Sequence, residues 1–286
     1  MARTARFKVE GQEVFYHVYS RVAGSKGEYP LEEKAAQREL IHVINHYAKA
    51  YFCEVAAFSV MGNHYHAVLK FAEPRQVSRE ELMARAKILY PSTESEKVLK
   101  FGWTDEKWNR LNDRLFDVSE YMRNVQSRFA RWYNRSFKRQ GRFWADRFKS
   151  TVLNGPEAVL DCMIYIELNS IRAGIKQLQG RPEEYTGSSM YYREKGSHFE
   201  LMDLAEVIES KEPYNEYKAR VYYRGVQETE QNKGSIPETV LIKEQKRGFK
   251  KRGVYRKRIR YFTDGVAIGS EAFIRTQIEK IREQGR

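Results

Sequence analysis

Cysteine is scarce in this chain: its 286 residues include only Cys53 and Cys162, and no Cys-x-x-Cys spacing. Two distant cysteines are more typical of buried apolar side chains than of a disulfide or a zinc site. Long hydrophobic runs are also lacking, since none approaches the roughly 20 residues of a membrane-spanning helix, and the basic start of the chain leads into no apolar signal core. We therefore expect a cytoplasmic protein with no membrane partner.

Acidic residues are in deficit. Asp and Glu number 38 against 51 Lys and Arg, which gives a formal net charge of +13 and a pI near 9.5. The hydrophobic share of 41% and the aromatic share of 13% are enough to build a core of one large domain or two small ones. Such a basic globular protein is expected to bind a polyanion, and nucleic acid is favoured over an anionic membrane surface.

Aromatic and β-branched runs predict strands at residues 14–21, 52–61 and 64–71, and apolar residues at helical spacing predict a helix at 31–49. Gly62-Asn63 is typical of a tight turn that pairs the last two strands as a hairpin. The order strand, helix, strand, strand predicts an α+β fold with a ferredoxin-like, RRM-like palm, in which an antiparallel sheet carries helices on one face.

The remainder of the chain is predicted to be mainly helical. Residues 73–117 are polar and helix-prone, and we interpret them as an insertion. Helices are predicted from residue 118, at 155–172 and at 199–223, with a short extended piece that ends at residue 153. We expect residues 1–195 to form one domain and residues 196–286 a basic helical extension that binds DNA.

Two histidines separated by one residue, His64 and His66, lie in the third predicted strand. Side chains alternate faces along a strand, so both imidazoles are expected on one face. They can hold a divalent cation if a neighbouring element supplies a third ligand, and the helix at 155–172 offers Asn169 or Asp161. The alternative is a structural histidine pair in a hairpin.

Tyr165 lies four residues from both Asp161 and Asn169, so these three side chains share one face of the predicted helix. A tyrosine hydroxyl that attacks a phosphodiester forms a phosphotyrosine, which keeps the bond energy for rejoining. Because a phenol has a pKa of about 10, it needs help, and Mg²⁺ or Mn²⁺ acting as a Lewis acid can give it. Most of the 19 tyrosines must simply pack, so the spacing carries this interpretation.

Basic side chains interleaved with aromatic ones suit contacts to phosphates and stacking on unpaired bases. An isolated charge run is more commonly a solvated face, and the net charge and the aromatics favour nucleic acid here. The DNA-binding candidates are Arg142, Trp144, Arg147, Lys149 and Arg172, followed near the end of the chain by Lys250, Lys251, Arg252, Arg256, Lys257 and Arg258.

Three stretches resemble a known family. The residues Met61 to His66 resemble the "MPNHxH" signature of the single-tyrosine HUH transposases, and Tyr165 to Gly174 resembles their "YIHxNPVRAG" helix. Gly141 to Ser150 is similar to the "GxxFxxRFKS" segment of the REP-associated tyrosine transposase branch, and Tyr185 to Ser189 is more weakly similar to "Y.WSS". The match covers roughly residues 7 to 192. Gly62 and Ser170 stand where the family usually has proline.

The resemblance implies that His64 and His66 bind divalent Mg²⁺ or Mn²⁺, that Asn169 is the third ligand and that Tyr165 is the nucleophile. It implies a transposase or single-stranded DNA endonuclease that cuts beside hairpins formed by imperfect palindromes and leaves a 5′-phosphotyrosine and a free 3′-OH. A non-catalytic protein that binds structured nucleic acid stays open as an alternative, as does a replication-initiation or relaxase-type nickase. We expect a monomer, with a dimer as the alternative.

Overall fold

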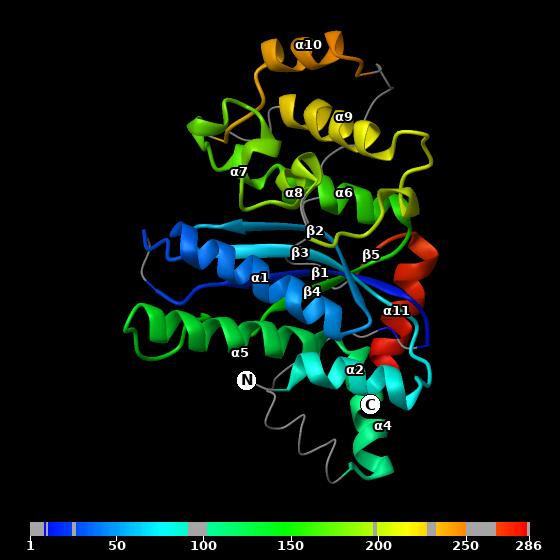
Figure 1. Ribbon diagram of the computed structural model, residues 1–286. Helices are drawn as coiled ribbons and strands as arrows, with labels where there is room; N and C mark the ends of the chain where they lie inside the picture. The colour runs from blue at the N-terminus through cyan, green and yellow to red at the C-terminus, as the bar shows by residue number, and fades with distance from the viewer. Residues whose placement is uncertain are drawn as a thin grey trace.

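The computed structural model describes residues 9, 11–24, 27–90, 102–196, 199–227, 233–249 and 267–284. A five-stranded sheet with the order β2-β3-β1-β4-β5 runs through the middle of the molecule (Figure 1). All its neighbouring strands are antiparallel except β4 and β5, which are parallel. The strands are β1 (Val14–Arg21), β2 (Cys53–Met61), β3 (His64–Phe71), β4 (Lys149–Leu153) and β5 (Ala267–Ile268).

Two crossover helices, α1 (Lys34–Ala50) and α5 (Val118–Ser136), cover one face of the sheet (Figure 1). With the strand order of the first four strands, they give the ferredoxin-like arrangement, so the predicted α+β class is confirmed. In its described residues, the segment interpreted as an insertion forms helices α2 (Arg79–Leu89) and α4 (Asp105–Leu115), on the outer side of this layer.

Helices α5, α2 and α4 begin where a side chain satisfies one or two of their first backbone N–H groups. The Asp117 carboxylate accepts hydrogen bonds from the backbone of Ser119 and Glu120 at the start of α5. The side-chain oxygens of Ser78 and Thr104 accept from the third residue of α2 and of α4 in the same way. These caps explain why the polar insertion folds as helices although its apolar pattern is weak.

Helices also cover the other face of the sheet, which the prediction of a single helical face did not include. They are α6 (Pro156–Glu167), α7 (Asn169–Arg172) and α8 (Ser189–Lys195), followed outward by α9 (Pro213–Val226) and α10 (Glu238–Lys246). The physical reason lies in β2, whose alternating residues are apolar on both faces: Ala57 packs in the cluster around α6, and Phe58 in the cluster around α1.

Two predicted helices have different bounds in the structure. The helix expected at 155–172 is divided at Leu168 into α6 and α7. The helix expected at 199–223 was wrong in its first part, because α9 begins only at Pro213 and Leu204–Glu206 form a separate short turn. Proline has no backbone N–H to donate and its fixed φ suits the first helical position, so Pro213 starts a helix rather than continuing one.

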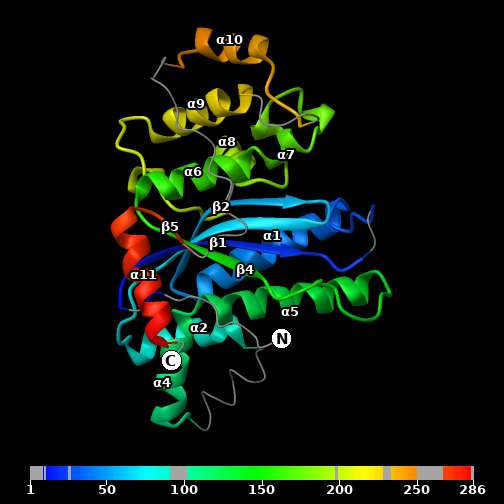
Figure 2. The ribbon, with the colours of Figure 1, turned by 180° about the vertical axis from the view of Figure 1, so that it is seen from behind.

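The last described segment returns to the sheet edge. After α10 the chain reappears as β5, which pairs with β4, and continues into α11 (Glu271–Gln284) beside the sheet (Figure 2). Both ends of the predicted extension 196–286 therefore pack on the palm, through α9 and through β5. Among the residues that the structure describes, no helix has the length and apolar character needed to cross a membrane.

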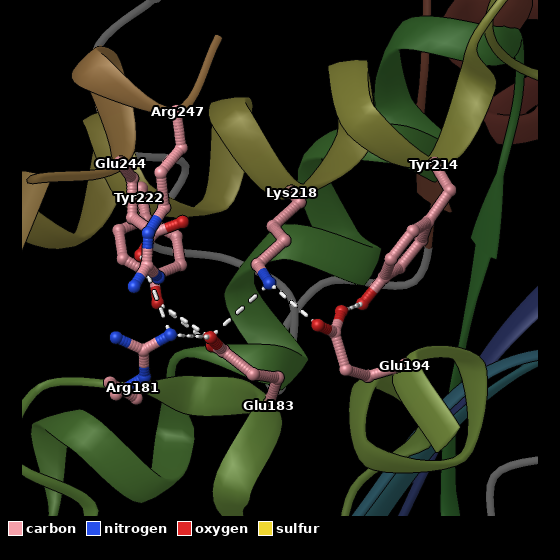
Figure 3. A network of polar contacts seen from close by, with 8 residues as sticks. All are labelled: Arg181, Glu183, Glu194, Tyr214, Lys218, Tyr222, Glu244 and Arg247. Carbon is pink, nitrogen blue, oxygen red and sulfur yellow. Dashed lines mark hydrogen bonds and ion pairs between the residues drawn. The ribbon is translucent and has the colours of Figure 1, made fainter. Parts of the chain in front are cut away.

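A network of polar side chains, of which Glu183, Lys218, Tyr222 and Glu244 are buried, joins α9 and α10 to the chain below them (Figure 3). The Lys218 ammonium lies 3.3 Å from a Glu183 oxygen and 3.0 Å from a Glu194 oxygen, and the Tyr222 hydroxyl donates to both Glu183 oxygens at 2.8 and 2.9 Å. Glu183 is only 1% exposed, so its carboxylate depends on these partners. The network comprises Arg181, Glu183, Glu194, Tyr214, Lys218, Tyr222, Glu244 and Arg247.

We predict that Lys218→Met lowers the free energy of unfolding by about 3 kcal/mol, because it removes a cation from between two carboxylates while Glu183 stays buried. Urea unfolding followed by circular dichroism measures the change. The matched control is Lys211→Met, at an exposed lysine with no ion pair in the described part of the chain, and its expected change lies within about 0.5 kcal/mol. Equal effects from the two substitutions would contradict the role given to the network.

Candidate functional site

Side chains of β1 and β3 that share the α6 face form the candidate site. In the antiparallel register, Tyr19 is opposite His66 and Arg21 is opposite His64. Because residues two apart on a strand point to the same face, His17 joins Tyr19 and Arg21 on this side. The ring centroid of Tyr19 lies 4.8 Å from that of His66 and 5.6 Å from that of His64.

His66 is buried and held by a second histidine. Its Nδ1 atom is 2.9 Å from Nε2 of His17, and the two rings are stacked with centroids 5.1 Å apart and planes 8° apart. His17 and His66 are 1% and 2% exposed. Burial, followed by the neighbouring His17 and His64, lowers the pKa of His66 well below its ordinary value. The imidazole is therefore neutral at physiological pH.

His64 is held through the same ring atom. Its Nδ1 atom is 2.8 Å from the side-chain oxygen of Asn63, which accepts the hydrogen bond. Burial, with a smaller effect from the Arg21 guanidinium, lowers the pKa of His64 to about 4. Nε2 of each histidine has no hydrogen-bond partner among the described residues, whereas Nδ1 of each ring has one.

Tyr165 of α6 faces the two central histidines. Its ring centroid lies 5.8 Å from that of His66 and 6.4 Å from that of His17, with planes nearly perpendicular in both cases. Asn169 follows one turn later, at the start of α7, and its side-chain nitrogen is buried without a hydrogen-bond partner. Asp161, the other candidate ligand, lies 3.8 Å from the Arg224 guanidinium of α9.

These side chains suit a divalent cation. Two neutral imidazoles each present an Nε2 atom with no hydrogen-bond partner among the described residues, and the side-chain oxygen of Asn169 is of the kind that can add a third ligand. The buried Asn169 nitrogen, a donor with no described partner, suits an acceptor such as a phosphate oxygen. Within the described ranges, no three His, Cys, Asp or Glu side chains gather in a way that could hold a metal ion. A site here would therefore combine the two histidines with an amide ligand such as Asn169.

The residue between the tyrosine and the asparagine, Glu167, has a structural role. Its carboxyl group is fully buried, accepts hydrogen bonds from the Ser189 and Tyr217 hydroxyls, and accepts another from the Met190 backbone at 3.3 Å. Burial raises the pKa of Glu167 to about 7, against the smaller lowering effects of these bonds and of Arg193. Tyr217 belongs to α9, so this carboxyl links α6 to the outer helical layer.

The predicted DNA contacts in the loop before β4 lie in different environments. Arg142, Arg147 and Lys149 are exposed at one edge of the palm. Trp144 is 9% exposed, donates its indole N–H to the Gln126 carbonyl at 2.9 Å and packs against several rings of the core. Trp144 therefore serves the core in this structure.

The remaining predicted contacts are far from that loop along the chain. Arg172 donates to the backbone carbonyls of Gly234 at 2.9 Å and of Arg224 at 3.0 Å, so it ties α7 to the segment around α9. Its DNA contact stays a prediction. The candidates Lys250, Lys251, Arg252, Arg256, Lys257 and Arg258 lie outside the described residues.

Reasoning from the sequence missed three side chains at the site: His17, Tyr19 and Arg21. Their alternation along the first predicted strand was a usable signal, since a histidine, a tyrosine and an arginine share one face. What could not be read from the chain is that this face of β1 lies beside His64 and His66, because strand pairing is set by long-range packing.

Comparison with known proteins gives a distant structural likeness. No family model matches the chain, and no curated protein matches it. A solved structure described as "Structure of the REP associates tyrosine transposase bound to a REP hairpin" is similar in fold, with a TM-score of 0.43 and 13% sequence identity. The similar region covers 73% of this chain and 99% of that one.

Glu167 leads to a prediction about stability and pH. Its pKa of about 7 in the folded protein exceeds the value of 4.5 for an ordinary glutamate, so folding favours the protonated form. Stability from this group is therefore present below pH 4.5 and is lost as the pH rises toward 7, by an amount of about 3 kcal/mol.

The measurement is urea unfolding of the wild type and of Glu167→Gln at several pH values between 4.5 and 8. We expect the wild type to lose stability relative to the variant as the pH rises, since the amide does not ionise. The difference between the two proteins cancels the titration of the histidines, and a difference that does not change with pH would contradict the shifted pKa.

Proposed function

We propose that the protein is a metal-dependent single-stranded DNA endonuclease or transposase, which cleaves and rejoins hairpin-bearing DNA through Tyr165. The observation that carries this proposal is the grouping of Tyr165 with His66 and His17, at ring-centroid distances of 5.8 and 6.4 Å, although Tyr165 follows them by 99 and 148 residues along the chain. Two of the motifs that resemble the HUH transposases contribute His66 and Tyr165, and His17 lies outside the motifs.

The chemistry assigned to Tyr165 is nucleophilic attack on a phosphodiester. The phenol oxygen forms a bond to phosphorus while the bond from phosphorus to the 3′ oxygen breaks, the phenol proton is given up, and the leaving 3′ oxygen takes one up. The DNA then ends in a free 3′-OH on one side and a 5′-phosphotyrosine on the other. Attack of a 3′-OH on the phosphotyrosine reverses the step and joins the strands.

The protein groups proposed to hold the metal are Nε2 of His64, Nε2 of His66 and the side-chain amide of Asn169. Bound Mg²⁺ or Mn²⁺ supplies a Lewis acid that polarises a phosphoryl oxygen. Asn63 and His17 form hydrogen bonds to Nδ1 of the two rings, which leaves Nε2 of each ring as the proposed metal ligand. Because both imidazoles are neutral well below pH 7, no proton has to leave before a cation binds.

DNA is proposed as the partner because of charge and surface. The chain carries a net charge of +13, and exposed Arg142, Arg147 and Lys149 lie in the segment that resembles a family motif. Arg21 is exposed beside His64, where a guanidinium suits a phosphate oxygen of the bound strand. Hairpin DNA as the specific form rests on the resemblance and needs a direct test.

We predict that the wild type, incubated with Mn²⁺ and a labelled single strand that contains a hairpin, forms a covalent protein–DNA adduct that survives denaturing electrophoresis. Tyr165→Phe should reduce adduct formation by at least ~10³-fold, because the nucleophilic oxygen is gone. Tyr191→Phe, at a tyrosine of α8, is the matched control and should react at the wild-type rate.

The outcomes separate the alternatives. An adduct that persists in Tyr165→Phe would remove the nucleophile assignment. Tight hairpin binding by the wild type without any adduct or cleavage, across a set of hairpin substrates, would favour the non-catalytic alternative. Cleavage at a site whose distance from the hairpin varies freely would favour a nickase of the relaxase type.

A further inference from the structure

We propose that His17 is the positioning residue for His66: it accepts a hydrogen bond from Nδ1–H of His66 and so fixes the tautomer that leaves Nε2 bare. This inference rests on the proposed function. The contact is the 2.9 Å approach of His17 Nε2 to His66 Nδ1, between two side chains that are almost completely buried. His17 belongs to the central strand β1, paired on both sides, so its backbone has little freedom to move.

One shared proton decides what His66 can do. A neutral imidazole carries its proton on one nitrogen and a lone pair on the other. If His17 donated to Nδ1 of His66, the proton of His66 would be on Nε2, and Nε2 would have no lone pair for a metal. If His66 donates from Nδ1, Nε2 is bare and its lone pair is available to a metal.

The arrangement at His64 supports the second assignment. There the partner of Nδ1 is the Asn63 side-chain oxygen, which can only accept, so the proton of His64 is on Nδ1 and its Nε2 is bare. Two histidines on one strand face, both bare at Nε2, make a matched pair of ligands. Stacking of the His17 and His66 rings, with planes 8° apart, restricts rotation of the His66 ring as well.

The first test reads the tautomer without any metal. A long-range proton–nitrogen NMR spectrum of protein labelled at its histidines, with the His66 signals assigned by their loss in His66→Ala, should show the proton on Nδ1. His17→Leu removes the acceptor at similar volume and should allow the other tautomer. A wild-type spectrum with the proton on Nε2 overturns the proposal, and this measurement decides alone should His17→Leu not fold.

The second test reads metal affinity from the electron paramagnetic resonance of Mn²⁺. His17→Leu should raise the dissociation constant 10- to 100-fold, the usual effect of removing a partner that orients a metal ligand. His17→Gln, whose amide oxygen can accept in place of the imidazole, should restore most of the affinity. His42→Leu, at an exposed histidine of α1, is the matched control and should change nothing. Unchanged affinity in His17→Leu overturns the proposal.

Failure of the proposed function is distinguishable from failure of this inference. Mn²⁺ binding that is insensitive to His64→Ala would show that the metal does not bind at this site and would contradict the proposed function. The tautomer of His66, measured without metal, would still test whether His17 positions it. Activity is not needed in either test.

A separate observation concerns the end of α5. We infer that its exposed tip, defined by Arg131, Arg135, Phe137 and Lys138, binds single-stranded DNA. Residues 121–145 include no Asp or Glu but seven cations, which are Arg123, Arg128, Arg131, Arg135, Lys138, Arg139 and Arg142. None of the three cations of the α5 tip forms an ion pair with another described residue.

The α5 tip combines the two features that single strands require. Phe137 stacks on Tyr133, with ring centroids 4.4 Å apart and planes 25° apart, so Tyr133 contacts one face of its ring. Phe137 is nevertheless 41% exposed, so part of its side chain is open to solvent. Arg131 and Arg135 are one turn apart on the helix surface, and Lys138 follows them. Cations beside an exposed ring suit phosphates and an unpaired base.

The α5 tip also lies at the end of the sheet that carries the site. Arg139 donates to the Ala23 carbonyl at 3.3 Å, and the Ala23 N–H donates to the Phe143 carbonyl at 2.7 Å. Ala23 is two residues beyond Arg21, which pairs with His64. A strand that leaves the site past Arg21 therefore meets the α5 tip.

The test compares two variants with the same loss of charge. A triple variant of the α5 tip, R131Q with R135Q and K138Q, should weaken binding of a labelled oligothymidine and lower the slope of log affinity against log salt by about 2. The control triple variant, K87Q with K107Q and K211Q, changes exposed lysines elsewhere and should retain the wild-type slope. Phe137→Ala should weaken binding roughly tenfold with the slope unchanged.

Equal salt slopes in the two triple variants would mean that only the net charge matters, and would overturn the proposal that the α5 tip is a docking site. A loss seen only with a blunt hairpin duplex, and not with oligothymidine, would overturn the single-stranded partner. If the wild type binds neither the oligothymidine nor the hairpin, the proposed function itself is contradicted. If the wild type binds DNA and the α5-tip variants bind it equally well, only the role of the α5 tip is contradicted.

Discussion

The register between β1 and β3 is the constraint on which the candidate site depends. Placing Tyr19 opposite His66 and Arg21 opposite His64 puts five polar and aromatic side chains on the α6 face. A slip of one residue in either strand would turn its set to the α1 face, into the apolar cluster that holds Tyr16, Val18 and Tyr65. The hydrophobic pattern of the strands therefore determines both which residues form the core and which side chains meet at the candidate site.

Because the site depends on strand register, the sequence could predict the individual strands and helices but not the full set of residues at the site. Strands β1, β2 and β3 and helix α1 agree with the sequence prediction to within a few residues, because local periodicity and turn residues determine them. The pair of His64 and His66 on one face also follows from local geometry. His17 could not be found this way, since its approach to His66 is made by pairing between strands about fifty residues apart.

The same limit applies to the contacts that Trp144 and Arg172, both predicted to bind DNA, make within the protein. Interleaved aromatic and basic residues look alike whether the rings stack on bases or close a core. In the structure the Trp144 ring fills the space between β3 and α5, and the Arg172 guanidinium is used by backbone carbonyls near α9. The sequence pattern does not distinguish the two cases, because burial is set by elements distant in sequence, and contact of either residue with DNA stays a prediction.

Gly62 shows how a departure from a family pattern can have a local cause. A Cβ atom built at Gly62 would lie 2.9 Å from side-chain atoms of both Glu32 and Tyr29, and the Gly62 carbonyl accepts from the Leu31 N–H at 2.8 Å. The loop before α1 thus rests on the turn that carries Asn63 and His64. A residue with a side chain at position 62 would make the Glu32 and Tyr29 side chains shift, so glycine lets the loop before α1 pack closely on this turn.

Glu167 makes the corresponding link on the other side of the site. It lies between Tyr165 and Asn169 and holds Ser189 and Tyr217, so the orientation of α6 over the histidines is coupled to the seating of α8 and α9. The outer helices are in turn tied down by Glu183 and Lys218. Two buried acidic side chains, Glu167 and Glu183, therefore help to position Tyr165: Glu167 links α6 to α8 and α9, and Glu183 holds the outer helices. Through these contacts the segment after residue 196 contributes to the position of Tyr165.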